Sequence, residues 1–219
     1  TGTEQVFLPF LGLKLTQQQR EPLPRITLFS PITQCVYLMF LYEEDLVINT
    51  TQMAQRLNIS EMSASRALNA LAENALLTFA WSGPLNRSKT YRRLEGPQYV
   101  SKGLPFLQSP VLRTVFTNTK VYDGPIAGLE ALSKMSMLNS PRYSVRAISS
   151  KQMSAHHFTI TKDPGAFPAQ DIIELQLWRY DPLLFCKDDV VDPISLYASL
   201  KEVKDERVIQ ALEEMVKGF

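Results

Sequence analysis

The chain has few cysteines, few histidines and almost no net charge. Its two cysteines, Cys35 and Cys186, lie far apart and form no Cys-x-x-Cys motif, which excludes a zinc finger or a zinc ribbon. The 23 basic and 22 acidic side chains give a net charge of +1, so any contact with nucleic acid or anionic lipid has to be made by a local patch. The longest apolar run near the start, residues 6–13, contains Pro9 and is too short to cross a membrane. We therefore expect a cytoplasmic protein that keeps both thiols reduced and does not enter a membrane.

The sequence also lacks the motifs of common enzymatic chemistry. It contains no glycine-rich phosphate loop and no dinucleotide-binding fingerprint. His156 and His157 are adjacent, and neighbours on a strand point to opposite faces, so the pair is poorly placed to share a metal ion. Asp188, Asp189 and Asp192 could gather a divalent cation, but a solvated acidic turn before a helix is the simpler interpretation. We expect no enzyme activity, no metal ion and no cofactor.

Composition and length are those of an ordinary globular protein. Hydrophobic residues make up 45% and charged residues 21% of the chain, which excludes a disordered tail, a collagen-like repeat and a coiled-coil rod. The 219 residues fit one large domain or two small ones. We expect an extended segment over residues 1–29, a helical domain ending in a hairpin over residues 30–95, and a mixed α/β domain over residues 96–219. The Pro-, Gly- and Ser-rich stretches around Gly96-Pro97 and over residues 103–110 suit the connection between the two domains. The predicted fold class is α+β.

The first 29 residues carry strand signals rather than helix signals. Val6–Leu8 and residues 26–29 are rich in β-forming side chains, and a polar stretch over residues 16–20 lies between them. Prolines within the segment disfavour a helix.

Two helices are expected over residues 31–57. Ser30 followed by Pro31 is typical of a helix start, and apolar residues at helical spacing predict an amphipathic helix over residues 31–45. A short second helix follows, and the candidates for its N-cap are Asn49, Thr50 and Thr51.

A third helix is expected over residues 61–75. Ser60 can accept a hydrogen bond from a backbone N–H two or three residues further on, and Ile59 in the turn is expected to point inward. The outer face of this helix is small and polar, with Ser63, Ser65, Arg66 and Asn69. Such side chains reach base edges and phosphates without bulk, so the helix could enter a DNA major groove. Taken alone, a solvated helix face explains the pattern equally well.

The residues after this helix predict a β-hairpin with a basic tip. Strand-forming residues 76–81 and 90–94 flank a turn over residues 82–86. From Arg56 to Arg93, six basic and two acidic side chains give a local charge of +4. Basic side chains on a hairpin can hold phosphates or enter a minor groove, and those expected to do so are Arg87, Lys89 and Arg92.

A recurrent motif links the turn, the third helix and the first strand. It consists of Ile59-Ser60, Ser65-Arg66-Ala67-Leu68, Leu71 and Leu76-Leu77. The stretch around it, residues 32–95, resembles the winged helix-turn-helix of bacterial regulators of the MarR type. The resemblance implies a DNA-binding domain, and a homodimer is expected because one recognition helix covers only a half-site.

Two features depart from that family. Asn74-Ala75 stands where the family often has the glycine that ends the recognition helix. Because asparagine tolerates the left-handed conformation, we expect the helix end to move by one residue. The hundred-odd residues that follow are the second departure, since typical members of the family lack them.

A helix is also expected early in the C-terminal half. The turn Asp123-Gly124-Pro125 opens it, and it ends near Leu138. Its inner face is expected to hold Ile126, Leu129, Leu132 and Met135. The run over residues 124–132, followed by Ser136-Met137-Leu138, resembles the segment after the winged helix in abortive-infection antitoxins. Those proteins join a winged helix to a second domain and repress their own operon.

The rest of the C-terminal half predicts strands and two helices. Strands are indicated around Val145, over residues 158–160 and over residues 173–177. The sequence Asp192-Pro193 and the residue Asp205 are expected to begin the helices. The aromatic residues at 178 and 180 share a strand face, which is either core or, if exposed, a surface for a partner or ligand.

These features predict a sequence-specific DNA-binding transcriptional regulator that acts as a repressor. The expected contacts to double-stranded DNA are Thr51, Ser60, Ser63, Ser65, Arg66, Asn69, Arg87, Lys89 and Arg92. Residues 96–219 are expected to supply dimerisation, or a site for a protein partner or an effector. The alternative is a protein-protein interaction module or an antitoxin-like partner-binding protein, which the near-neutral net charge favours.

Overall fold

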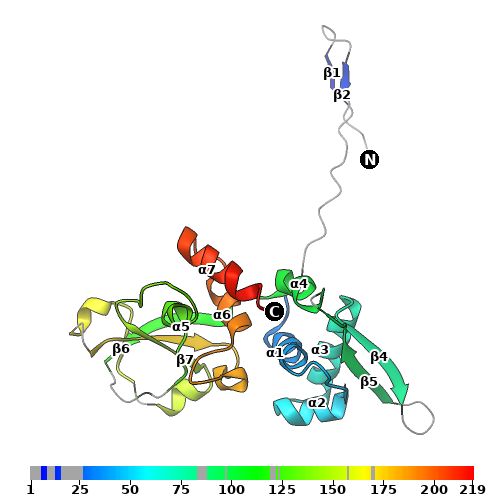
Figure 1. Ribbon diagram of the computed structural model, residues 1–219, viewed down its shortest axis with the longest axis horizontal. Coiled ribbons are helices and arrows are strands. Elements are labelled where there is room, and N and C mark those ends of the chain that lie inside the picture. Colours follow the sequence, from blue (N-terminus) through cyan, green and yellow to red (C-terminus); the bar gives the residue numbers. More distant parts are fainter. Residues whose placement is uncertain are drawn as a thin grey trace.

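Figure 1 shows helices and strands following one another along the chain of the computed structural model, so the fold is α+β as the sequence predicts. The structure describes residues 6–8, 13–15, 27–82, 88–96, 98–118, 122, 124–156, 158–168 and 171–219. At the start of the chain, β1 (Val6–Leu8) pairs with β2 (Leu13–Leu15) in an antiparallel hairpin. The strand at β1 was predicted and β2 was not. The polar stretch over residues 16–20 and Ile26 lie outside the described residues.

Three helices and a small antiparallel sheet form the next part of the chain. The helices are α1 (Pro31–Tyr42), α2 (Thr50–Leu57) and α3 (Glu61–Glu73). The sheet contains β3 (Ile48–Asn49), β4 (Leu77–Ser82) and β5 (Ser88–Arg93) in the order β3-β5-β4. Consequently β4 is an edge strand. The short strand β3 was not predicted.

The predicted helix starts are confirmed by side-chain caps. The Ser30 hydroxyl accepts a hydrogen bond from the backbone N–H of Thr33 at 3.1 Å, and Pro31 is the first helical residue. Asn49 caps α2 in a reciprocal pair with Gln52, and the Ser60 hydroxyl accepts from the N–H of Ser63 at 3.2 Å. Each cap satisfies a backbone donor that the first helical turn leaves without a partner.

The end of α3 differs from the prediction. Asn74 has φ −84°, and its side-chain amide donates to the carbonyl of Ala70 at 2.7 Å. The left-handed residue is Ala75, with φ +53°. This hydrogen bond from the Asn74 side chain to the helix holds Asn74 close to helical backbone angles. The left-handed conformation that ends the helix is therefore adopted by the next residue, Ala75.

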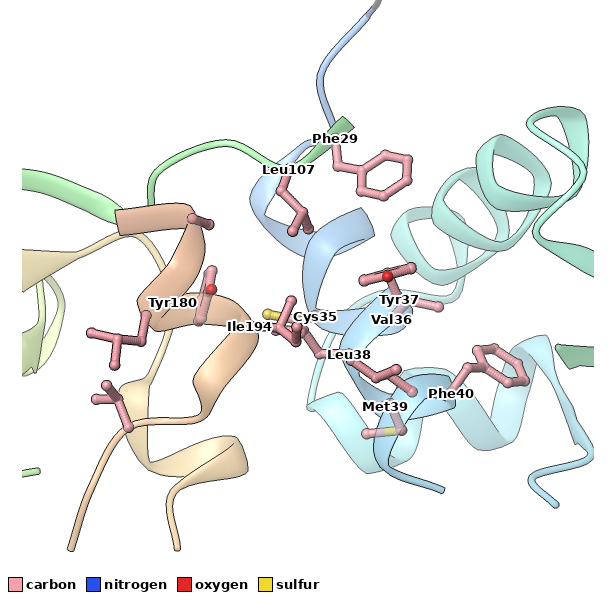
Figure 2. Close-up of a cluster of buried hydrophobic side chains, with 14 of the residues drawn as sticks. Phe29, Cys35, Val36, Tyr37, Leu38, Met39, Phe40, Leu107, Tyr180 and Ile194 are labelled. Carbon is pink, nitrogen blue, oxygen red and sulfur yellow. The ribbon is translucent and has the colours of Figure 1, made fainter. Parts of the chain in front are cut away.

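Helix α1 is buried on every side, which corrects the prediction of an amphipathic helix over residues 31–45. It ends at Tyr42, and every residue from Thr33 to Leu41 is buried. Figure 1 shows α1 between α3 on one side and the C-terminal half on the other. In Figure 2 the side chains of Cys35 and Ile194 meet on one side of α1, while Phe40 points away from them. The amphipathic prediction failed because the second set of partners comes from residues far along the chain.

The Pro- and Gly-rich stretch expected to connect two domains forms part of the packed structure. The chain from Gln98 to Phe106 forms α4 (Gln98–Gly103) and the 3₁₀ helix η2 (Leu104–Phe106). Tyr99 is buried and stacks on Tyr37 with ring centroids 4.9 Å apart, and its hydroxyl donates to the Tyr37 carbonyl at 3.0 Å. This segment therefore packs against α1 instead of lying exposed.

The C-terminal half is built on a four-stranded sheet. Its strands are β6 (Val111–Thr117), β7 (Ser144–Ser149), β8 (Ile160–Thr161) and β9 (Ile173–Trp178), in the order β7-β9-β6-β8. Strand β7 is parallel to β9, whereas β6 is antiparallel to both of its neighbours. Strand β6 was not predicted from the sequence. Trp178 and Tyr180 are buried, so their interpretation as core is confirmed.

Three helices accompany this sheet. They are α5 (Gly128–Met135), α6 (Pro193–Leu200) and α7 (Glu206–Val216), and the last two begin at Asp192 and Asp205 as predicted. The predicted inner face of α5 is confirmed at Leu132 and wrong at the other positions. Leu132 is buried, but Leu129 and Met135 are 40% and 39% exposed, and Ile126 precedes the helix in β-bridges to Arg146 and Val190. Because α5 begins at Gly128, Ala131 and Leu132 form its buried face.

The larger of two hydrophobic clusters runs through both halves of the described chain, and the smaller one, Val115, Ile148, Leu175 and Leu177, lies within the C-terminal half. The larger cluster extends from α1, α2 and α3 to α6 and α7. Polar contacts cross the same boundary, since the buried Gln34 amide donates to the Tyr180 hydroxyl and to the Gln108 carbonyl, both at 3.1 Å. The C-terminal half is thereby held against α1. In the described part of the chain, no helix is long and apolar enough to cross a membrane.

Candidate nucleic-acid interface

A polar groove lies where α2, α3 and the β4–β5 hairpin converge. Its volume is about 370 Å³. Four of the predicted DNA contacts line it, namely Thr51, Ser65, Asn69 and Lys89. The remaining lining residues are Asn49, Thr50, Trp81, Ser88 and Tyr91. Residues from three separate elements thus meet at one surface, as the sequence predicts for these four.

The first turn of α3 carries two more predicted contacts. The Ser60 hydroxyl donates to the Ser63 hydroxyl at 2.9 Å while it caps the helix. One turn further on, Arg66 is exposed, and it makes no ion pair with any residue that the structure describes. Met62 lies one turn before Arg66 and is 65% exposed. The outer side of α3 is therefore open to solvent, and its exposed charged side chains are Arg66 near the middle and Glu61 and Glu73 at the two ends.

A hydrogen bond fixes α3 to the hairpin inside the groove. The Tyr91 hydroxyl donates to the Asn69 side-chain oxygen at 3.0 Å. Burial raises the pKa of Tyr91, so the hydroxyl keeps its proton near neutral pH and remains a donor. The bond orients the Asn69 amide, whose NH₂ group is left available as a donor.

Lys89 and Arg92 lie on opposite faces of the hairpin. Side chains alternate along a strand, and Lys89 pairs with Trp81 whereas Arg92 pairs with Thr78. Lys89 therefore faces the groove. Arg92 lies instead in a second depression of about 320 Å³ that also contains Glu44, Asp45 and Glu95. Arg87 lies outside the described residues.

Two of the basic side chains in this region are paired with acids. Arg56 contacts Glu43 through both ends of its guanidinium group, at 2.9 and 2.5 Å. Arg93 contacts Glu44 at 2.9 Å and is largely buried. Both acids follow α1 and lie before Arg56, so the charge count from Arg56 to Arg93 did not include them. Among the described basic residues of that range, Arg66, Lys89 and Arg92 are left without an ion pair.

Two aromatic side chains on β4, which were not predicted as site residues, are exposed. Phe79 is 45% exposed and Trp81 is 56% exposed. They lie two positions apart in a strand and so share the face that carries Lys89. The alternation of residues along a strand places both rings on one face, and this pattern is the sequence signal for the aromatic surface.

The other candidate residues named from the sequence are the histidine pair and three aspartates. His156 is exposed and stacks on Phe158 at 5.1 Å, while His157 lies outside the described residues. Asp188 and Asp189 lie in an exposed turn with φ +50° and +59°, whereas Asp192 is buried as the cap of α6. No group of three His, Cys, Asp or Glu residues in the described ranges could hold a metal ion.

The two cysteines are unpaired and differ in exposure. Cys35 is buried and Cys186 is half-buried, and both are free thiols. Burial next to Asp192 and Asp181 raises the pKa of Cys35 to about 12, so its thiol stays protonated.

Comparisons with protein-family models, with curated proteins and with solved structures find no match to this chain. The function is therefore inferred from the geometry of the groove.

Proposed function

We propose that this protein binds double-stranded DNA through a winged helix-turn-helix and acts as a transcriptional repressor. The proposed DNA-binding unit consists of α1–α3 with the β3-β5-β4 sheet, in which the β4–β5 hairpin is the wing. The observation that carries the proposal is the groove in which Ser65 and Asn69 of α3 face Lys89 of the hairpin. The order of the elements, the exposed polar face of α3 and the hairpin support this proposal.

In the proposed complex, α3 enters the major groove. A major groove about 12 Å wide admits an α-helix, and the small side chains on the outer face of α3 allow a close approach. Arg66 is exposed and can donate two hydrogen bonds to a guanine, and the Asn69 amide can read a base edge. Ser60, Ser63 and Thr51 lie at helix starts, where hydroxyls and backbone N–H groups can contact phosphates.

The hairpin supplies the positive charges that are proposed to contact the phosphate backbone of the DNA. Lys89 faces the groove and can neutralise a phosphate, and Arg87, which precedes β5 in the sequence, is proposed to do the same. Arg92 lies on the opposite face among acidic side chains, so its proposed contribution is the smallest of the three.

A homodimer is part of the proposal, since one recognition helix covers only half of a two-fold symmetric operator. The C-terminal half, residues 96–219, is proposed to supply the dimer contact or a site for a protein partner. Its close packing on α1 supports such a role, because any change in its position would act directly on a helix of the DNA-binding unit.

The test is a fluorescence anisotropy titration of the full chain with labelled random duplex DNA at about 50 and about 200 mM salt. We expect the affinity to fall steeply between the two, with a slope of log K against log salt close to −0.9 for each phosphate neutralised. Lys89→Ala should make that slope less steep by the contribution of about one phosphate contact, which is about 0.9. Lys134→Ala on α5 is the charge-matched control, since this exposed lysine lies in the other half.

The alternative function is a protein-interaction module. The pairing of Arg56 and Arg93 with glutamates favours it, because it lowers the positive charge available to DNA. Absence of DNA binding at the lower salt concentration, or equal slopes for wild type and Lys89→Ala, would support this alternative.

A further inference from the structure

Phe79 and Trp81 form an exposed aromatic face on an edge strand. With 45% and 56% of their surfaces in solvent, they are among the most exposed large aromatics in the described chain. A charged or polar side chain would be expected at such positions, because an exposed aromatic edge strand invites aggregation. Two neighbouring exposed aromatic side chains therefore indicate a surface that binds a ligand or another macromolecule.

The two rings are held in a defined arrangement. Their planes are nearly perpendicular, at 89°, with centroids 6.1 Å apart. The Lys89 ammonium lies 4.2 Å from the Phe79 centroid and 5.1 Å from the Trp81 centroid. Contacts of this kind favour one orientation of each ring, so the indole is preorganised at the mouth of the groove.

The surroundings of Trp81 are polar rather than apolar. The same groove contains the Asn69 amide, the hydroxyls of Thr51 and Ser65, and the Lys89 ammonium. A nucleobase combines a flat π face, a rim of hydrogen-bonding groups and an attached phosphate. The groove offers an aromatic face for the first, donors and acceptors for the second, and a cation for the third.

We propose that Trp81 stacks on a nucleobase of the bound DNA, with Phe79 supporting the indole and Lys89 neutralising the neighbouring phosphate. This inference rests on the proposed function. The stacked base has two possible sources, a base step that the hairpin opens in an intact duplex or a base that is already unpaired. Both present the same exposed ring face.

Tryptophan fluorescence gives a direct test, since the chain has only two tryptophans, Trp81 and Trp178. Trp178 is fully buried, so a change in emission on binding and protection from a water-soluble quencher report on Trp81. Trp81→Phe gives the background signal of Trp178 alone. The probes are a blunt duplex, the same duplex with one unpaired base, and one of its single strands.

We expect the emission of Trp81 to be quenched by DNA and its exposure to the soluble quencher to be lost. Trp81→Ala should weaken DNA binding about tenfold without changing the salt slope, and Trp81→Phe should recover much of the loss, because stacking carries no charge. Leu183→Ala is the control, as this side chain is 55% exposed and lies in the C-terminal half. Circular dichroism checks that each variant is folded.

The outcomes separate this inference from the proposed function. Salt-dependent binding by the wild type, with unchanged Trp81 emission and equal affinity of Trp81→Ala, overturns stacking and leaves DNA binding in place. No binding of any probe at low salt overturns both. A Trp81-dependent dimer in sedimentation without DNA also overturns stacking, because it assigns the β4 edge to a second copy. If the duplex with one unpaired base binds more tightly than the blunt duplex, the stacked base is one that is already unpaired. If the two duplexes bind equally, the stacked base comes from a base step that the hairpin opens.

Discussion

The hydroxyl of Tyr42 donates a 2.8 Å hydrogen bond to the carboxylate of Asp192, 150 residues further along the chain. Tyr42 is the last residue of α1 and Asp192 caps α6. The same carboxylate oxygen accepts from the backbone N–H of Ser195 at 2.8 Å, and the Ser195 hydroxyl is 2.7 Å from that of Tyr180. A buried polar network therefore joins the proposed DNA-binding unit to the C-terminal half.

Replacing Tyr42 with phenylalanine should destabilise the protein by about 1–3 kcal/mol, because the buried carboxylate of Asp192 loses a donor. The measurement is the free energy of unfolding from urea titration, monitored by circular dichroism. Tyr197→Phe on α6 is the matched control, since the Tyr197 hydroxyl has no hydrogen-bond partner among the described residues. Equal stability of the two variants would contradict a structural role for the bond.

The pH dependence of stability should reveal the burial of Asp192. Burial raises the pKa of this carboxyl above its ordinary value of 3.8, although hydrogen bonds from Ser195 and Tyr42 oppose the shift. The folded state then binds the proton more tightly than the unfolded chain. This contribution to stability is fully present below the unfolded pKa and is lost as the pH rises through the higher, folded pKa.

Asp192→Asn removes that titration and keeps the helix cap, because asparagine is also a good N-cap. We expect the variant to gain stability relative to wild type as the pH rises from about 4 to about 7, measured by urea unfolding at each pH. Asp205→Asn, at the exposed cap of α7, is the solvent-exposed control. A difference between wild type and Asp192→Asn that stays constant over this range would show that Asp192 does not titrate differently on folding.

Local features of the fold could be predicted from the sequence. Helix caps at Ser30, Ser60 and Asp192 involve residues three apart, so short sequence patterns contain all the information they need. The burial of α1 could not be predicted in the same way, because its outer face packs against residues such as Ile194 that only the completed fold brings near.

The candidate site, like the fold, could be predicted from the sequence only where local spacing determines the position of a side chain. The sequence identified the residues of α3 that line the groove, because helical spacing determines which side chains face outward. It did not separate Lys89 from Arg92, although strand alternation would have done so once the strand was known to span Ser88–Arg93. The pairing of Arg93 with Glu44 depends on the loop after α1 and has no local signal.

The end of α3 offers a test of backbone strain. Ala75 has φ +53°, which costs a residue with a β-carbon about 1–2 kcal/mol and costs glycine almost nothing. Ala75→Gly should therefore stabilise the protein by about 1 kcal/mol in urea unfolding, after allowing for the greater freedom of glycine in the unfolded chain. Ala70→Gly in the same helix should destabilise it by a similar amount. Loss of stability in both variants would mean that residue 75 is not left-handed in solution.

Substitutions of Arg66 and Arg93 should affect different properties, the first DNA affinity and the second the stability of the fold. Arg66 is exposed on α3, so Arg66→Ala should leave urea unfolding unchanged, weaken binding to the preferred operator by about 1–3 kcal/mol and relax its base preference. Arg93 has a largely buried side chain that donates to the Leu41 carbonyl at 3.4 Å and lies 5.5 Å from the Tyr99 ring centroid.

Arg93→Ala should therefore destabilise the fold by about 1–2 kcal/mol through lost packing and an unsatisfied carbonyl. The ion pair itself adds little, since Glu44 is 72% exposed. DNA affinity, measured by anisotropy under conditions where the variant is fully folded, should stay close to that of wild type. If Arg93→Ala instead lowered DNA affinity as much as Arg66→Ala while leaving stability intact, the DNA contact surface would have to be extended from the α3 groove along β5 to the end of the strand beside Glu44.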